Sequence, residues 1–207
     1  METGAEGLTV EERGRVERTF AALEARGVSC TFVKDRVAAL AELLERIPKG
    51  AAVAHGTSTT LNEIGFVDAM KRPDFGYRYL NAEWQAENDP ARRARLRARL
   101  SVDADVFLGS VQAICETGEV IGADASGSRQ AFYTYGPPRV IWVAGVNKLV
   151  PTLGDGLRRI REVALPLEDR RIRAAGGTGS SIGKLVIYER ERPGRIILVL
   201  VGEDLGF

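Results

Sequence analysis

The sequence predicts an α/β fold with an open, mostly parallel sheet and helices on both faces. Helix-like and strand-like segments alternate through residues 9–70, the order that gives a parallel sheet. The strand-like segment at residues 51–54 is small and apolar throughout, as buried strands are. The chain has 207 residues, of which 44% are hydrophobic, so it is long enough to bury one sizeable core.

Helix caps and stops define the first elements. Thr9 and Glu12 have the spacing of a capping box, and Gly27 ends the helix that they begin. Asp35 is the expected N-cap of the next helix, which Pro48 stops. The elements expected here are helices over residues 9–26, 36–47 and about 60–70, and strands over residues 28–33 and 51–54.

The alternation is interrupted in the middle of the chain. Residues 71–89 are polar and irregular, and Pro90 then begins an arginine-rich helix. Beyond it, residues 116–118 separate two short apolar runs at hairpin spacing. The elements expected from here on are strands over residues 105–108, 111–115, 119–123, 139–144, 184–189 and 195–201, and a helix near residues 153–163. Residues 1–50 are predicted to form a helical and strand extension that packs on a core, residues 51–207, with an excursion near residues 71–100.

Composition excludes several classes of protein. The net charge is +1, from 29 basic and 28 acidic residues, so no global charge favours nucleic acid or an anionic membrane as partner. No apolar run approaches the ~18 residues of a spanning helix, and the N-terminus lacks a secretory pattern, so we expect a cytoplasmic protein. Cys30 and Cys115 are too few for an iron–sulfur cluster, and a single histidine excludes a histidine-rich metal site.

The first candidate site is the loop after the strand at residues 51–54. Four residues there supply flexibility and hydroxyl donors, namely Gly56, Thr57, Ser58 and Thr59. Ligands of open α/β sheets bind at the carboxyl ends of strands, and a helix start there favours an anion. The loop therefore suits a carboxylate or a phosphate. The same hydroxyls also suit simple capping of the helix that follows.

The second candidate site lies around the predicted hairpin. Glu116 follows an apolar run and precedes a tight turn, a position that suits a carboxylate nucleophile or general base. The alternative is a solvated acid in the turn. Arg129, behind a turn of small residues, is placed to clamp a substrate carboxylate with its two-pronged guanidinium. The alternative for Arg129 is an ion pair with Asp124.

The third candidate site follows the strongest predicted strand. Asn147 and Lys148 come directly after residues 139–144, where an amide and an amine are well placed to face an anionic ligand. The alternative is a strand-to-helix loop in which Lys148 points to water.

Three other signals point to structure. The glycine-rich stretch at residues 175–183 lacks the spacing of a nucleotide-binding loop and is predicted to be a mobile loop or tether. The arginines between Arg92 and Arg99 follow nearby acids, so they favour a solvated helix face. His55 is interpreted as a structural histidine.

Several linked motifs carry a family resemblance. Residues 112–129 read QAICETGEVIGADASGSR, residues 135–137 YGP, and residues 140–150 VIWVAGVNKLV. Together with GTSTTLNEIG at residues 56–65 and LVLVGEDLG at residues 198–206, they resemble the LUD-domain family, in particular the single-domain lactate-utilisation proteins of the C type.

The resemblance implies a fold like that of ribose-phosphate isomerases and coenzyme A transferases. In the transferases a glutamate in a Glu-Asn-Gly turn is the nucleophile, and Glu116 in Glu-Thr-Gly looks like its counterpart, although threonine replaces the asparagine. The matched motifs add Glu63 and Gly127 to the expected binding residues, beside Asp124. The chain lacks the cysteines that many relatives have near residues 174–183, so no cofactor is expected on it.

The resemblance also implies a role in a cytoplasmic system that oxidises L-lactate to pyruvate, with clusters on iron–sulfur sister proteins. The chain would bind a small carboxylate, a phosphate-bearing ligand or an activated acyl ligand, and a homodimer is an expected possibility. Two alternatives stay open. One is a structural or sensing subunit for the iron–sulfur partners, and the other is a stand-alone sugar-phosphate isomerase or acyl transferase.

Overall fold

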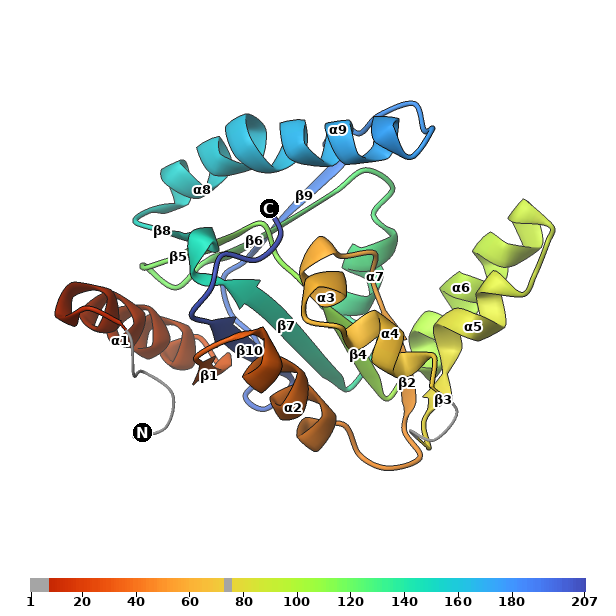
Figure 1. The fold of residues 1–207 in the computed structure, drawn as a ribbon, viewed down its shortest axis with the longest axis horizontal. Helices are drawn as coiled ribbons and strands as arrows, with labels where there is room; N and C mark the ends of the chain where they lie inside the picture. The colour runs from red at the N-terminus through yellow and green to blue at the C-terminus, as the bar shows by residue number, and fades with distance from the viewer. Residues whose placement is uncertain (1–7, 73–75) are drawn as a thin grey trace.

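The computed structural model describes residues 8–72 and 76–207. Its main sheet has six parallel strands in the order β1-β10-β7-β4-β2-β3 (Figure 1). The strands are β1 (Ser29–Val33), β2 (Ala52–His55), β3 (Arg78–Tyr79), β4 (Val106–Gly109), β7 (Arg139–Gly145) and β10 (Ile196–Val201). The predicted α/β fold with a mostly parallel sheet is confirmed.

A second, smaller sheet has the order β8-β5-β6-β9. Its strands are β5 (Ala113–Cys115), β6 (Val120–Asp124), β8 (Leu149–Val150) and β9 (Lys184–Tyr188). The β5–β6 pair is antiparallel, which confirms the hairpin predicted around residues 116–118. The last two strands of the chain, β9 and β10, are consecutive in sequence but belong to different sheets. The chain therefore passes from one sheet to the other between them.

Helices cover the sheets in layers (Figure 1). The helical segments are α1 (Val10–Ala25), α2 (Arg36–Arg46), α3 (Thr59–Glu63), α4 (Phe66–Met70), α5 (Leu80–Gln85), α6 (Pro90–Asp103), α7 (Ser128–Thr134), η2 (Val146–Lys148), α8 (Leu153–Arg159), η3 (Ile160–Ala164) and α9 (Leu165–Ala174). Side chains of α2, α3 and α4 share a core with one face of the main sheet, and those of α1, α5 and α7 share a core with the other. Among the described residues, no helix has the length and apolar character needed to cross a membrane.

Alternation along the central strands explains the two cores. On β10, Leu198 and Leu200 face the α1 side, whereas Val199 and Val201 face the α2 side. All four are buried, because a parallel sheet with helices on both faces leaves neither face to water. A third, smaller core lies between the second sheet and Ile160 of η3.

Two of the predicted helices have different limits in the structure. The helix expected over residues 60–70 is divided into α3 and α4, because Gly65 adopts a φ of 76° and ends the first turn. The helix expected near residues 153–163 continues to Ala174 through the π-helical turn η3. Pro166 lies just beyond that turn and has no N–H for the carbonyl four residues earlier, so the turn widens there.

The N-terminal part is joined to the core by strand pairing. β1 pairs with β10 along five residues and forms one edge of the main sheet, so residues 29–33 are part of the sheet itself. The excursion expected near residues 71–100 contains β3 at the other edge, followed by α5 and α6. The predicted arginine-rich helix is α6, and it begins at Pro90 as expected.

Leu198 tests the role of the buried central strand. Leu198→Ala is expected to lower the free energy of unfolding by about 2–5 kcal/mol, because it removes a fully buried side chain and leaves a cavity. Urea denaturation followed by circular dichroism measures this change. Val37→Ala, at a position 75% exposed on α2, should change it by no more than ~0.5 kcal/mol. Equal effects of the two variants would contradict the assignment of β10 to the core.

Candidate functional site

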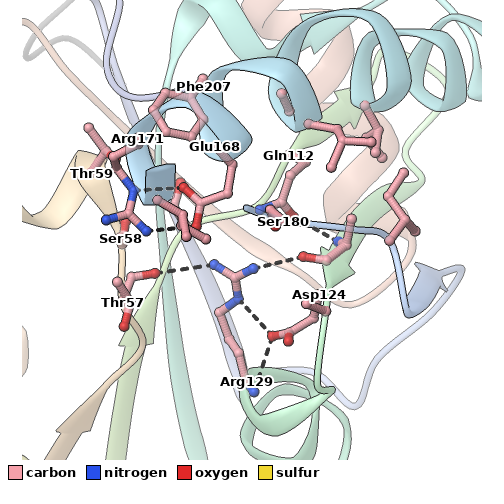
Figure 2. A pocket seen from close by; sticks show the side chains of 18 of the residues that line it. Thr57, Ser58, Thr59, Gln112, Asp124, Arg129, Glu168, Arg171, Ser180 and Phe207 are labelled. Carbon is pink, nitrogen blue, oxygen red and sulfur yellow. Dashed lines mark hydrogen bonds and ion pairs between the residues drawn. The ribbon is translucent and has the colours of Figure 1, made fainter. Parts of the chain in front are cut away.

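A cavity of about 210 Å³ lies between the carboxyl edge of the main sheet and the second sheet (Figure 2). This is far more than the ~30 Å³ that one water occupies in the liquid, so the cavity has room for a small metabolite. Residues that follow four neighbouring parallel strands line one side: Thr57 to Thr60 after β2, Ser110 and Gln112 after β4, Lys148 after β7, and Phe207 after β10. Residues of the second sheet and of the helices beside it line the other.

The loop after β2 has the geometry that the sequence suggested. Ser58 is the N-cap of α3, since its Oγ accepts the N–H of Leu61 at 3.2 Å. The same residue lines the cavity together with Thr57 and Thr59, so capping and a place in the candidate site are compatible. Gly56 lies behind them. A Cβ there would stand 2.9 Å from Cδ of Arg129, so glycine lets that arginine lie across the end of β2.

Lys148 is the most unusual side chain of the site. It is only 1% exposed, and its Nζ donates hydrogen bonds to Ser110 Oγ at 2.7 Å and to Thr60 Oγ1 at 2.9 Å. No carboxylate lies within ion-pair distance of it among the described residues. Burial, with the positive charges of Arg159 and Arg129 nearby, lowers the pKa of this amine to about 7, and Glu63 offsets this only in part.

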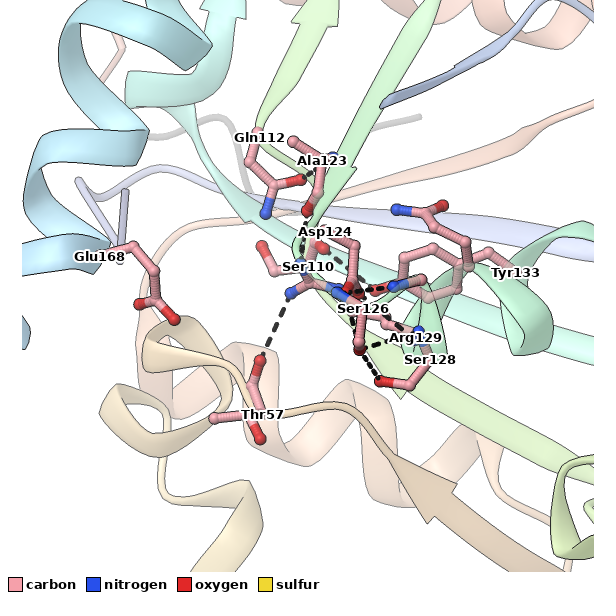
Figure 3. A network of polar contacts seen from close by, with 12 residues as sticks. Thr57, Ser110, Gln112, Ala123, Asp124, Ser126, Ser128, Arg129, Tyr133 and Glu168 are labelled. Carbon is pink, nitrogen blue, oxygen red and sulfur yellow. Dashed lines mark hydrogen bonds and ion pairs between the residues drawn. The ribbon is translucent and has the colours of Figure 1, made fainter. Parts of the chain in front are cut away.

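Asp124 and Arg129 organise the opposite wall (Figure 3). Asp124 Oδ1 accepts the N–H groups of Ser126 and Gly127 at 3.1 and 2.9 Å, which fixes the turn before α7. Gly127 adopts a φ of 86° in this turn, a conformation that favours glycine. Gly127 thus shapes the wall without lining the cavity.

The Arg129 guanidinium reaches across the cavity. Its Nη2 donates to the Ala123 carbonyl at 2.7 Å and its Nη1 to the Thr57 carbonyl at 3.4 Å, so it ties the second sheet to the loop after β2. Its Nε has no hydrogen-bond partner among the residues that the structure describes, although it lies 3.5 Å from Asp124 Oδ2. Arg129 therefore forms the ion pair with Asp124 and also lines the cavity, and its role as a clamp for a substrate carboxylate stays a prediction.

Asn147 and Glu63 hold the C-terminal segment instead of lining the cavity. Asn147 Oδ1 accepts the N–H of Leu205 and its Nδ2 donates to the carbonyl of Gly206, each at 3.2 Å. Glu63 Oε2 accepts the N–H of Gly206 at 2.7 Å. These contacts seat the end of the chain so that Phe207 becomes part of the cavity wall. Both residues thus support the site indirectly.

Glu116 lies away from the cavity. It follows β5 as predicted, but it faces α1, where its carboxylate pairs with Arg15 Nε at 2.7 Å and with Arg18 Nη2 at 3.5 Å. It is not among the residues that line the cavity, and its catalytic role stays a prediction.

His55 is buried, and its ring nitrogens contact Tyr79 Oη at 2.7 Å and the carbonyl of Gly56 at 2.9 Å, as suits a structural histidine.

The glycine-rich stretch is a wall of the cavity rather than a tether. Residues 180–182 line it directly. The Ser180 N–H donates to Asp169 Oδ1 at 2.7 Å, and the Gly183 N–H donates to the Asp124 carbonyl at 3.1 Å. A Cβ on Gly183 would stand 2.0 Å from the Ala125 carbonyl oxygen, so only glycine allows this close approach of two backbones.

Several residues of the site escaped sequence analysis. They are Arg97, Ser110, Gln112, Ser128, Glu168, Arg171 and Phe207. Ser110 has a signal in the sequence, because it directly follows the buried strand β4. Glu168 and Arg171 continue a stripe with Ile160 and Ala164 at intervals of three and four residues, so helical spacing was the signal that could have grouped them.

Two cationic side chains of the cavity have no carboxylate within ion-pair distance in the described part of the chain. Arg171 pairs with both oxygens of Glu168 at 2.7 Å, and Arg129 pairs with Asp124. Arg97 lies over the ring of Trp84, 5.5 Å from its centroid, and its Nε has no hydrogen-bond partner in the described part of the chain. Within residues 8–72 and 76–207, Lys148 likewise has hydroxyl partners only. The site is therefore suited to a small anion.

Metal ligands do not gather anywhere in residues 8–72 and 76–207, where no three His, Cys, Asp or Glu side chains come together. Cys115 is buried in the second sheet, and desolvation raises the pKa of its thiol to about 12. A buried thiol of this kind behaves as an inert core residue.

The protein is an α/β protein with a cavity at the carboxyl edge of its parallel sheet, the place where ligands of open α/β sheets bind. Residues 16–201 match the LUD domain, so the chain belongs to the LUD-domain family, which is associated with lactate utilisation. A crystal structure of a DUF162 family protein from Deinococcus radiodurans is similar, with a TM-score of 0.55 and 13% identity over 94% of this chain and 100% of that chain. At this identity the similarity shows the fold alone. No curated protein matches the chain.

The buried amine gives a pH signature. Below pH 7 the folded and unfolded chains both carry a charged Lys148, and the folded chain bears the cost of burying it. Between the folded pKa of about 7 and the ordinary value of 10.5, only the unfolded chain binds this proton, so the free energy of unfolding rises with pH, by a few kcal/mol (~1.4 per pH unit). Urea denaturation of wild type and Lys148→Met from pH 6 to 10 measures the difference.

The variant Lys148→Met should lack this rise, because it has no group to titrate at this position. Lys49→Met, at an exposed lysine, should keep the wild-type pH dependence. Parallel curves for wild type and Lys148→Met would show that Lys148 titrates as an ordinary solvated lysine.

Proposed function

We propose that this protein is a component of a cytoplasmic system that oxidises L-lactate to pyruvate, and that it binds a small carboxylate or activated acyl anion in the cavity. The observation that carries the proposal is Lys148, a buried amine that lines a cavity with several hydroxyl groups and has no carboxylate partner among the described residues. A buried charge without a counter-ion is costly in a folded protein. A bound carboxylate or phosphate supplies that counter-ion.

The surroundings of Lys148 support an anion over a neutral ligand. Arg97 and Arg129 line the same cavity, and Arg97 Nε lacks a hydrogen-bond partner among the described residues. Guanidinium groups match the planar geometry of a carboxylate with two parallel donors. The loop hydroxyls of Thr57, Ser58 and Thr59 add donors that are neutral and adjustable. This combination suits lactate, pyruvate or a phosphate-bearing relative.

Family membership also suggests how ligand binding and electron transfer are divided between this chain and its partners. Membership of the LUD-domain family supports a role in lactate utilisation. Oxidation of lactate releases two electrons, and the sequence offers no nucleotide fingerprint or cluster motif to accept them. We therefore assign the electrons to iron–sulfur sister proteins, and ligand binding to this chain.

Growth on lactate tests the proposal. Deletion of the gene in its host is expected to abolish growth on L-lactate as sole carbon source and to leave growth on pyruvate intact, because only the step before pyruvate is lost. The wild-type gene and Lys49→Met should restore growth. Lys148→Met should not restore it, because the amine that contacts the anion is gone. Immunoblotting establishes equal protein levels. A deletion strain that grows on L-lactate at the wild-type rate would overturn the proposal.

Glu116 is tested separately, because it contacts Arg15 and Arg18 of α1 and does not line the cavity. Glu116→Gln is expected to lower the free energy of unfolding by less than about 1 kcal/mol, because its partners Arg15 and Arg18 are 35% and 66% exposed and water screens such ion pairs. Urea denaturation measures this change, with Glu203→Gln, which breaks the comparable pair with Arg36, as the matched control. A loss above about 2 kcal/mol would contradict the interpretation of Glu116 as a surface partner of α1.

The same variant in the deletion strain addresses the catalytic role. Failure to restore growth on L-lactate at unchanged stability would establish the chemical role that the resemblance predicts for Glu116. Full restoration would restrict Glu116 to its contact with Arg15 and Arg18.

A further inference from the structure

We propose that Ser110 is a catalytic nucleophile and Lys148 its general base, so that the cavity transfers the acyl group of a small anionic ester or thioester to Ser110 and then to water. The inference rests on the proposed function for the place of ligand binding and adds a class of reaction. It comes from the contacts of Ser110, a residue that neither the sequence motifs nor the family match singled out.

The first argument is the distance between the two groups. Lys148 Nζ lies 2.7 Å from Ser110 Oγ, and both residues line the cavity. A nucleophile and its base are recognised by hydrogen-bond reach between them and by a third group that orients the base. Thr60 is that third group, because its Oγ1 accepts a hydrogen bond from Nζ at 2.9 Å and lies 3.3 Å from Ser110 Oγ. Pairs of serine and lysine with these roles occur on unrelated folds.

The second argument is the protonation state. A lysine serves as a base only when it is neutral, and an ordinary lysine is charged at pH 7. Burial lowers the pKa of Lys148 to about 7, so a large fraction of the amine is neutral near pH 7. Ser110 is 4% exposed, so water does not compete strongly for its hydroxyl.

The third argument is the rigidity of the Ser110 backbone. The Tyr133 hydroxyl, itself buried, donates to the Ser110 carbonyl at 3.0 Å. A Cβ on Gly109 would stand 1.9 Å from that hydroxyl oxygen, so glycine before Ser110 makes room for the contact. Tyr133 is thus a positioning residue, which holds the nucleophile at the end of β4 (Figure 3).

The reaction balances without an oxidant or a metal. Ser110 Oγ attacks the acyl carbonyl carbon while its proton passes to Lys148 Nζ. The bond from that carbon to the leaving oxygen or sulfur then breaks, and Lys148 returns the proton to the leaving alcohol or thiol. Water attacks the resulting ester on Ser110 by the same route, which releases a carboxylic acid and restores the serine. The net reaction is hydrolysis of the ester or thioester.

The cavity supplies further groups for this substrate class. The Oε1 atom of Gln112 accepts the N–H of Ala123 at 2.8 Å, which fixes the amide and leaves its NH₂ as a donor in the cavity that Ser110 also lines. Such a donor suits the oxyanion of the tetrahedral intermediate. Arg97 and Arg129 suit a carboxylate or phosphate elsewhere on the substrate.

Acylation by 4-nitrophenyl acetate and by the anionic 4-nitrophenyl hydrogen succinate tests the proposal. The purified wild-type chain is expected to release a burst of one 4-nitrophenolate per chain and to carry the acyl group on the peptide that contains Ser110, as read by mass spectrometry. The burst rate should rise with pH through about 7, and the succinate ester should react faster, because the cavity is cationic.

Variants separate chemistry from folding. Ser110→Ala should show no burst, and Lys148→Met should acylate on the order of 10²–10⁴-fold more slowly without the pH step near 7. Ser29→Ala, at an exposed serine, and Lys49→Met should behave as wild type. Tyr133→Phe should slow acylation and keep the pH midpoint, as a positioning residue does. Circular dichroism establishes that each variant is folded.

The proposal is overturned if wild type shows no burst with either ester, if the acyl group lies on a lysine or another serine, or if Ser110→Ala acylates at the wild-type rate. Calorimetric titration of Ser110→Ala with L-lactate, pyruvate and phosphate distinguishes this failure from that of the proposed function. If Ser110→Ala binds one of these anions and the wild type is not acylated, the cavity is an anion site without this chemistry. If neither binding nor acylation is found, the cavity is not the ligand site.

Discussion

The parallel pairing of β2, β4 and β7 is the constraint on which the site depends. Each strand ends at the same edge of the sheet, so the residues that follow them meet although they are far apart in sequence. Thr60, Ser110 and Lys148 are brought within hydrogen-bond distance in this way. The second sheet and the helices beside it then close over this edge, which removes the three side chains from water and gives the amine its low pKa.

The same closure explains how the charges are distributed. Asp124 and Glu168 each neutralise one arginine of the wall, which lets Arg129 and Arg171 be partly buried at modest cost. Lys148 and Arg97 lack such partners among the described residues. An excess of positive charge suits an anionic ligand, and the hydroxyl groups of the cavity are donors that can turn toward its oxygens. In the two proposals the Lys148 amine has different protonation states, because its charged form would pair with an anion and its neutral form would act as the base.

Support for the site comes from residues that do not line it. Asn147 and Glu63 fix the C-terminal segment, and Gly127 and Gly183 permit the backbone turns and approaches that place the second sheet. Sequence motifs picked out Asn147, Glu63 and Gly127 beside Lys148 without distinguishing their roles. Glu116 shows the opposite case, because its motif resembles a nucleophile turn while its carboxylate faces the arginines of α1. Local sequence does not specify the element that packs against a turn.

The sequence by itself determined the α/β class, most helix caps, the hairpin at residues 116–118 and the family, because these depend on local spacing and on linked motifs. It also located the loop after β2, Arg129 and Lys148. Only the tertiary structure decided that Ser110 meets Lys148, that residues 180–182 form a wall, and that β9 and β10 belong to different sheets. The physical reason is that these contacts depend on strand order and on burial by distant segments, which no local pattern encodes.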